Sequence, residues 1–364
     1  MKNTFGNSIT LTLFGESHGP EIGAVIDGLC PGIAIDEKFM NHQLDLRRPY
    51  GKISTQRVEK DNFKIVSGVF KNKTTGAPLT VLIPNENIKS GDYTELRNIP
   101  RPSHADYTAF KKYNGFEDYR GGGHFSGRLT APIVAASAIL LTALKSKGIK
   151  IATHIKSCGD ISDRDFEDPK ADSDILNDLL FPVLDKQAET RMKEKIEKAA
   201  EEGDSVGGIL ETIVTGMPTG VGEPWFDSVE SVIAKGIFAI PAVKGIEFGA
   251  GFSFSEMNGS KANDQIVLKN GEIQTETNNN GGINGGITNG MPIIFRTVIK
   301  PTPSIFKKQR SVDINKMTEE DLLLKGRHDP AIFHRARVVI DSVTALATAD
   351  LLALKYGTDW FTEE

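Results

Sequence analysis

The spacing of apolar residues predicts strands in the first quarter of the chain. Four stretches alternate between apolar and polar positions, or run apolar over a short length, as strands do: 8–14, 21–28, 63–70 and 79–84. Between the second and third of these, Asp36 is placed to cap a helix that carries Leu44 and must end before Pro49.

The clearest helix is apolar along its whole length. Residues 130–147 are rich in Ala, Leu and Ile, Pro132 suits the first turn, and Gly148 follows the last. This composition predicts a buried helix. Elsewhere the pattern predicts strands at 207–215, 266–275 and 291–299 and helices at 227–239 and 340–355.

Two long stretches lack a regular apolar repeat over much of their length. Residues 85–128 are rich in Gly, Arg, His and Tyr, and we expect long functional loops there, because a structureless stretch of this length needs a reason. Residues 160–205 are acidic and then charged, with Met192, Ile196 and Ala199 on one helical face. We expect this second stretch to be a solvent-exposed surface excursion.

The order of these elements bears on the fold class. Antiparallel strand pairs with a few long helices favour an α+β fold, a β-α-β sandwich of layered sheets and helices, over a doubly wound sheet. Strands and helices recur in similar order in both halves, which hints at an internal pseudo-repeat. No linker separates independent parts, so residues 1–364 are expected to form a single domain.

Composition narrows the function classes. The 364 residues are 39% hydrophobic and 25% charged, which is enough apolar material for a core. A formal net charge of −5 argues against a general nucleic-acid binder. The two cysteines, Cys30 and Cys158, have no metal spacing and fit a reducing cytoplasm. The N-terminus has no apolar leader and no apolar run reaches about 18 residues, so we expect a cytoplasmic protein without a membrane span.

Ser17 and His18 stand between two glycines after the first predicted strand. A strand that ends there presents a hydroxyl and an imidazole at a sheet edge, where a ligand can reach them. Residues 15–19 also fit the G-x-S-x-G pattern of serine hydrolases, but that elbow needs a helix directly after the serine, and a strand is predicted here. Three interpretations stay open on these residues alone: a nucleophilic Ser17, a hydrogen-bonded turn, and a ligand-facing His18.

Basic residues gather at two places in this acidic chain. Residues 45–60 contain five basic residues against two acidic ones, which indicates an anion site or, alternatively, a solvated helix end. Residues 121–123 are all glycine and precede the apolar helix, with Arg120 and Arg128 on either side. Backbone amides of such a run can cradle an anion, and a flexible loop is the alternative.

Two further histidines have carboxylate neighbours. His104 is followed by Asp106, which could set its tautomer, although an exposed loop histidine is the alternative. His328 is followed by Asp329 and Pro330. None of the histidines has metal-ligand spacing, so a metal is not indicated. Histidines as proton donors and arginines as clamps point to a small, multiply anionic substrate such as a phosphate ester with carboxylates.

Taken together, and in order along nearly the whole chain, these segments resemble chorismate synthase. The matching stretches are 15–19, 101–106, 119–123, 243–247, 281–290, 300–305 and 326–330. The resemblance implies a β-α-β sandwich, usually a homotetramer. It also implies conversion of 5-enolpyruvylshikimate 3-phosphate to chorismate by anti-1,4-elimination of phosphate, the last common step of the shikimate pathway. The family requires reduced FMN without net redox change, and we expect an external NAD(P)H-dependent reductase to supply it.

The resemblance also implies roles for individual residues. His18 would donate a proton to the leaving phosphate, His104 would protonate or polarise the reduced flavin, and Asp329 would help the flavin act as base. Ser17 and Ser126 would support the hydrogen-bond network. The substrate anions would be bound by Arg47, Arg48 and Arg128. The flavin would be lined by His124, Phe125, Ser126, Ala242, Gly285, Lys300, Pro301, Thr302, Pro303, Ser304 and Arg327.

The chain departs from the family pattern in two places. His124 stands where many members have an arginine, which puts the phosphate contacts there in question. In the loop after Pro49, Lys52 takes the region of an arginine often found there, and a lysine cannot form a bidentate fork.

Overall fold

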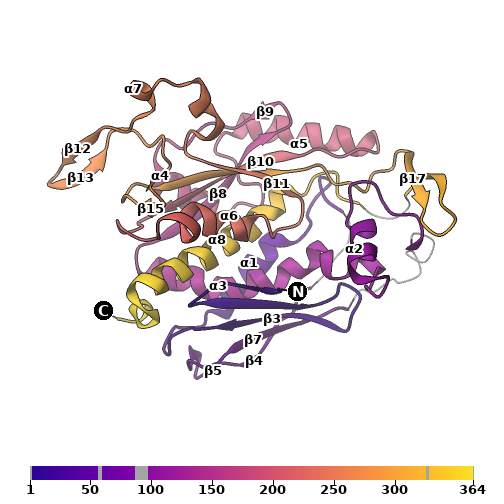
Figure 1. The fold of residues 1–364 in the computed structure, drawn as a ribbon, viewed down its shortest axis with the longest axis horizontal. Coiled ribbons are helices and arrows are strands. Elements are labelled where there is room, and N and C mark those ends of the chain that lie inside the picture. The colour runs from indigo at the N-terminus through magenta and orange to yellow at the C-terminus, as the bar shows by residue number, and fades with distance from the viewer. Residues whose placement is uncertain (1, 56–59, 87–96, 325–327, 364) are drawn as a thin grey trace.

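The computed structural model describes residues 2–55, 60–86, 97–324 and 328–363. Its N-terminal part forms an antiparallel sheet, here called the first sheet, with the strand order β1-β2-β3-β7-β4 (Figure 1). The strands are β1 Thr4–Phe5, β2 Thr10–Gly15, β3 Glu21–Asp27, β4 Lys64–Ser67 and β7 Leu79–Pro84. Because β2 pairs with β3, the turn that carries Ser17 and His18 lies at one end of the sheet.

A second antiparallel sheet has the strand order β11-β16-β10-β8-β9. Its strands are β8 Lys150–Cys158, β9 Ile161–Ser162, β10 Gly208–Thr215, β11 Val243–Phe248 and β16 Ile293–Ile299. In β16 every second residue is buried, as expected for a strand with one covered face. In β8 five consecutive residues are buried, because both faces of this strand are covered.

A layer of helices lies between the two sheets (Figure 1). They are α1 Glu37–Arg47, α3 Thr130–Ser146, α6 Val229–Ile237 and α8 Phe333–Tyr356. Helix α3 contacts β3 and β7 of the first sheet, α8 contacts β8 and β10 of the second, and the two helices pack on each other. Small buried residues of α3, among them Ala135 and Ala138, allow this close packing.

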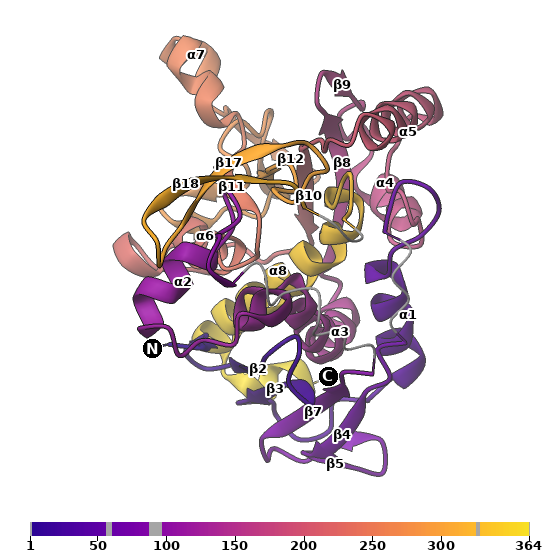
Figure 2. The ribbon, with the colours of Figure 1, turned by 90° about the vertical axis from the view of Figure 1, so that its right-hand side faces the viewer.

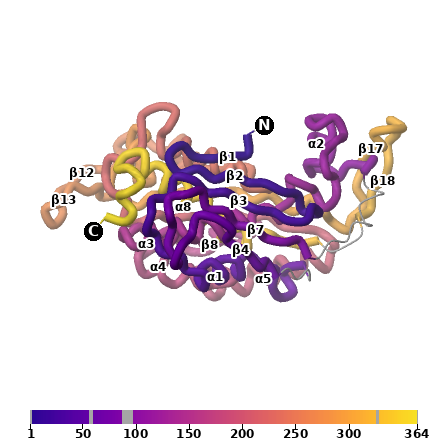
Figure 3. Tube along the Cα trace, turned by 90° about the horizontal axis from the view of Figure 1, so that it is seen from below, coloured from indigo at the N-terminus to yellow at the C-terminus, as the bar shows by residue number. Residues whose placement is uncertain are grey.

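Smaller elements lie at both ends of the layered sheets and helices (Figures 2 and 3). Helix α2 Asp106–Tyr113 lies at the same end as the hairpin of β17 Gln309–Asp313 and β18 Thr318–Leu322, and the hairpin of β12 Ile266–Lys269 and β13 Glu272–Thr275 projects from the opposite end. The remaining strands and α-helices are β5 Val69–Phe70, β6 Lys73–Thr74, β14 Ile283–Asn284, β15 Ile287–Thr288, α4 Pro169–Leu176, α5 Lys186–Glu201 and α7 Gly259–Ala262.

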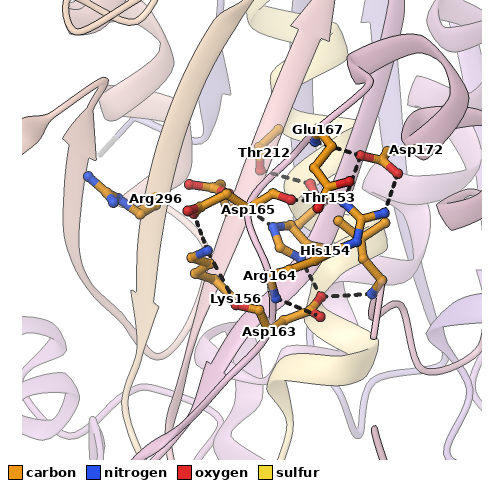
Figure 4. A network of polar contacts seen from close by, with 12 residues as sticks. Thr153, His154, Lys156, Asp163, Arg164, Asp165, Glu167, Asp172, Thr212 and Arg296 are labelled. Atoms are coloured by element: carbon orange, nitrogen blue, oxygen red, sulfur yellow. Dashed lines mark hydrogen bonds and ion pairs between the residues drawn. The ribbon is translucent and has the colours of Figure 1, made fainter. Parts of the chain in front are cut away.

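A polar network ties the 160–205 excursion to the outer face of the second sheet (Figure 4). On the inner face of β8, Thr153 Oγ1 donates to Asp341 Oδ1 of α8 at 2.6 Å. The next residue, His154, points to the outer face, where its ring nitrogens lie 2.8 Å from Asp163 Oδ2 and 3.0 Å from Glu211 Oε2. Asp163 therefore joins the excursion to a buried imidazole of the sheet.

The structure confirms the α+β class and most predicted elements. Asp36 caps α1 by accepting the amide of Phe39 at 3.0 Å, and the predicted face of α5 is buried at Met192, Ile196 and Ala199. The two predictions of an internal pseudo-repeat and of a single domain stay predictions.

Three element assignments from the sequence were wrong. Residues 266–275 form a hairpin rather than one strand, because Asn270 and Gly271 turn the chain with φ of 53° and 82°. Residues 85–128 are not only loops, since they contain α2. Helix α8 begins at Phe333 rather than at residue 340, because its charged first turns hide the apolar repeat.

One helix of the described residues is long and apolar enough to cross a membrane by length and composition. It spans Gly127–Ser146, and 72% of its most apolar window is buried inside the protein. Core helices of layered proteins pass the same test.

Candidate active site

The turn between β2 and β3 holds Ser17 and His18 against the glycine run. Both residues are buried, with 2% and 5% of their surface exposed. The amide of Ser17 donates to the carbonyl of Gly123 at 3.1 Å, and its hydroxyl lies 3.2 Å from the carbonyls of Arg120 and Gly121. Backbone contacts therefore bring together segments that lie about a hundred residues apart in sequence.

The side chains of Ser17 and His18 also contact each other. His18 Nδ1 lies 3.2 Å from Ser17 Oγ. The two backbone carbonyls lie equally close to this hydroxyl, which has a single proton to donate. The Ser17 hydroxyl therefore ties the His18 ring to the glycine run through its Nδ1 side.

The glycine run separates two histidines. Gly121 and Gly122 have φ of 59° and 85°. A Cβ on Gly121 would lie 2.1 Å from Cε1 of His18, and a Cβ on Gly122 would lie 3.4 Å from Cε1 of His104. Glycine is therefore needed at residue 121 for two reasons, its backbone conformation and the ring packed against it.

His104 belongs to a compact charged triad with Arg101 and Asp106. His104 Nδ1 lies 2.6 Å from Asp106 Oδ1, and Arg101 binds the same carboxylate through Nε and Nη2, both at 2.8 Å. Burial would raise the pKa of Asp106, but the hydrogen bonds from Arg101 and His104 outweigh it and hold the pKa well below its usual range. The ionised carboxylate keeps a proton on Nδ1 of His104 and turns Nε2 toward the glycine run.

His124 and Ser126 are both engaged in local structure. His124 Nδ1 donates to the carbonyl of Gly15 at 2.8 Å, and Ser126 Oγ accepts the amide of Arg128 at 3.2 Å. These bonds fix the segment that leads from the glycine run into α3. Phe125, between the two, remains 38% exposed.

A cavity of about 240 Å³ joins five of the predicted site residues. It is lined by Arg47, Arg48, Ser126, Arg128 and Asp329, together with residues that the sequence did not suggest, among them Thr55, Asp61, Ile240, Pro241 and Arg335. Its lining comes from α1, from the start of α3, from the segment after α6 and from α8. The tertiary structure thus gathers guanidinium groups from three elements around one hollow.

Asp61 is the buried counter-ion of this cavity. It accepts from Arg47 Nη2 at 2.6 Å and from Arg128 Nη1, and no part of its side chain is exposed. Burial would raise the pKa of Asp61, but the charges of Arg47 and Arg128 outweigh it and lower the pKa. Asp61 comes one residue after the basic stretch 45–60, and an acid beside clustered cations is the signal that could have identified it.

Several buried polar atoms around the cavity have no hydrogen-bond partner among the described residues. They are Nε of Arg48, Oγ1 of Thr55 and Nε of Arg335. Native proteins rarely leave such groups unpaired, because each costs about 1–3 kcal/mol. Buried guanidinium N–H groups that lack an acceptor among the described residues fit an anionic ligand with several oxygens.

The segment 300–304 runs beside the segment that carries His104. Lys300 Nζ donates to the carbonyl of Ser103 at 2.5 Å, and the Lys300 amide donates to the carbonyl of Ala242 at 3.0 Å. Ser205, which lies shortly before β10, donates from Oγ to the carbonyl of Thr302 at 2.7 Å. Burial, followed by the charge of Lys244, lowers the pKa of Lys300.

Not every predicted site residue joins this group. Gly285 sits in the turn of the β14–β15 hairpin, which forms hydrogen bonds with residues of the segment 218–229. Arg327 lies outside the described residues. His104 lines a smaller hollow of about 30 Å³, next to the larger one across the segment 122–127. The convergence of His18, His104 and Asp329 on one ligand therefore stays a prediction.

The structure does not support the hydrolase alternative. Ser17 is followed by β3 rather than by the helix that a nucleophile elbow requires. Its hydroxyl is also turned toward backbone carbonyls.

An α+β fold whose cavity gathers arginines around buried carboxylates is typical of an enzyme that acts on a small anionic molecule. The chorismate synthase family model matches residues 9–353. The chain is 46% identical to a chorismate synthase of Thermococcus gammatolerans, over 95% of this chain and 96% of the relative, and 45% identical to one of Dehalococcoides mccartyi, over 98% of each. A crystal structure of a chorismate synthase superimposes with a TM-score of 0.76 at 28% identity, covering 97% of this chain and 94% of the other.

The chain belongs to the chorismate synthase family, and its enzymes are phosphate-eliminating lyases. The resemblance inferred from the sequence motifs is therefore confirmed at the level of the family.

Proposed function

We propose that this chain converts 5-enolpyruvylshikimate 3-phosphate to chorismate, with release of phosphate and with reduced FMN bound, as the last common step of the shikimate pathway. The observation that carries the proposal is the cavity with Arg47, Arg48 and Arg128 beside Asp329. A substrate with a phosphate and two carboxylates needs several cations in a confined site, where their electrostatic effect is larger than in water.

The residues present fit a flavin. Thr302 has a buried hydroxyl without a described partner, and Lys300 supplies a nearby cation. When bound, reduced FMN would supply electron density that stabilises an electron-poor transition state. The residues proposed to hold it are His124, Phe125, Ser126, Ala242, Gly285, Lys300, Pro301, Thr302, Pro303, Ser304 and Arg327.

The protein side chains would manage the protons. His18 would donate from Nε2 to the departing phosphate oxygen, because its Nδ1 is engaged with Ser17. His104 would hold a proton at Nε2, with its other nitrogen fixed by Asp106. Asp329 would help the bound flavin act as base, with its carboxylate placed to relay the proton lost from the substrate. A positioned general acid or base of this kind contributes roughly 10²–10⁴-fold in rate.

The test is an anaerobic assay of phosphate and chorismate, with and without dithionite-reduced FMN. We expect both products in equal amounts only when reduced FMN is present. FMN binding without phosphate release would indicate a flavin-binding protein instead. Labelling of Ser17 by a fluorophosphonate, with no effect of flavin, would indicate a hydrolase.

The remaining expectations belong to the same proposal. We propose a cytoplasmic homotetramer that receives reduced FMN from a separate NAD(P)H-dependent reductase. The two antiparallel sheets with helices between them support a β-α-β sandwich, with each half of a pseudo-repeat contributing one sheet.

A further inference from the structure

Asp329 is held in place by donors from two separate segments. The amide of Thr55 donates to Oδ1 at 3.0 Å, and Nη2 of Arg335 donates to Oδ2 at 2.5 Å. The carboxylate is 12% exposed and the Arg335 side chain 21% exposed, so the pair lies in the cavity wall but partly shielded from water. With one donor on each oxygen, rotation of the carboxylate is restricted.

Arg335 has a rigid base. It lies in the first turn of α8, where its amide donates to the carbonyl of Ile332 at 3.2 Å, and it is followed by a long run of buried residues. Asp329 lies outside any helix or strand, four residues before α8 begins. Of the two partners, Arg335 is therefore the one whose backbone is fixed by regular structure, and Asp329 takes its orientation from it.

The residue before Arg335 strengthens this arrangement. His334 is fully buried, and its Nε2 lies 2.8 Å from Ser54 Oγ, with Tyr50 and Phe181 packed against the ring. Burial lowers the pKa of His334 to about 3, so the ring is neutral. His334 thus holds Ser54 directly. Its neighbour Arg335 holds Thr55 through Asp329.

We propose that Arg335 is a positioning residue for the reaction: it orients the Asp329 carboxylate in the cavity and acts through it. This inference rests on the proposed function, in which Asp329 helps to remove a proton from the substrate. The competing interpretation is that Arg335 binds a substrate anion directly through its buried Nε.

A double-mutant cycle separates the two roles. Single-turnover phosphate release is measured with reduced FMN for wild type, Arg335→Ala, Asp329→Asn and the double variant. If Arg335 acts through Asp329, each single variant slows release at least about tenfold, and the double variant matches Asp329→Asn within about twofold. If the rate loss of the double variant equals the product of the two single losses, or if Arg335→Ala raises KM and leaves kcat unchanged, Arg335 binds substrate directly and the proposal is overturned.

Chemical rescue provides a readout that loss of packing alone would not change. Millimolar methylguanidine should raise the rate of Arg335→Ala at least about threefold over its rate without the additive. The rate of the double variant should not change, because the added cation needs the Asp329 carboxylate. Equal rescue of both variants, or of neither, would count against the proposal. Should Arg335→Ala fail to fold, Arg335→Gln replaces it in the cycle.

The matched control is Arg164→Ala. Arg164 pairs with Asp172 at 2.6 Å on the outer face of the second sheet, away from the cavity, and its loss should leave turnover unchanged. An inactive wild type would contradict the proposed function rather than the role of Arg335. An active wild type with independent effects in the cycle would contradict only the role of Arg335.

Discussion

Replacement of His154 by Gln is expected to destabilise the protein and to remove one component of its pH dependence. Both ring nitrogens face carboxylates, Asp163 at 2.8 Å and Glu211 at 3.0 Å. Ionised carboxylates only accept hydrogen bonds, so a ring that carries protons on both nitrogens, and hence a positive charge, satisfies both partners. Burial would lower the pKa of His154, but the hydrogen bonds with Asp163 and Glu211 outweigh it and raise the pKa above its ordinary value of 6.5.

The size of the effect follows from what the substitution leaves behind. Removal of one partner from a buried ion pair costs about 3–5 kcal/mol, because the remaining charge is uncompensated. Asp163 keeps the amide donors of Arg164, Leu184 and Asp185 at 2.7–2.9 Å, so we expect a loss near the lower end, about 3 kcal/mol.

The sign of the pH dependence follows from the raised pKa. The contribution of His154 is complete below its unfolded-state pKa of about 6.5 and is lost as the pH rises through the higher folded-state pKa. Its slope cannot exceed about 1.4 kcal/mol per pH unit for one proton. The pKa of Asp163 is lowered instead, because the hydrogen bonds outweigh its burial, so its contribution is lost only in acid.

The assay is the free energy of urea unfolding between pH 5.5 and 9 for wild type and His154→Gln. The difference between the two proteins should be largest at pH 5.5 and shrink toward pH 9. The control is His42→Gln, since His42 is 40% exposed in its side chain and faces Asp178 at 3.2 Å on the surface. A difference that stays constant with pH, or that the His42 variant reproduces, would refute the reasoning.

Three further outcomes concern the site. His18→Ala should bind FMN like wild type, measured by flavin fluorescence, but turn over more than tenfold more slowly; unchanged turnover would exclude His18 from the mechanism. Asp329→Asn should bind both ligands and eliminate phosphate slowly in a single turnover, and a wild-type rate would contradict its role as a base. Gly121→Ala should lose at least about tenfold in kcat, because its Cβ would fall 2.1 Å from His18 and its φ of 59° suits glycine. The matched substitution Gly127→Ala should lower kcat much less, because a Cβ there meets nothing within 4 Å and does not reach the His18 ring.

The sequence alone determined the elements whose signals are local. The Asp36 cap, the apolar helix α3 and the paired strands β2 and β3 follow from the spacing and capping of nearby residues. The family followed from motifs because glycines, histidines and arginines at fixed places reflect the chemistry of a ligand. Helix α8 was misjudged at its start because its polar first turns hide the apolar repeat, and His334 in them is paired with Ser54, 280 residues away in the chain.

Only the tertiary structure decided which charges meet. Asp61 lies between Arg47 and Arg128, and Asp329 lies between Thr55 and Arg335, although no repeat or spacing in the sequence connects these residues. The same holds for His154, which lies between two carboxylates from different segments. The physical reason is that hydrophobic patterning is read from neighbours along the chain, whereas ion pairing depends on which layers pack against each other.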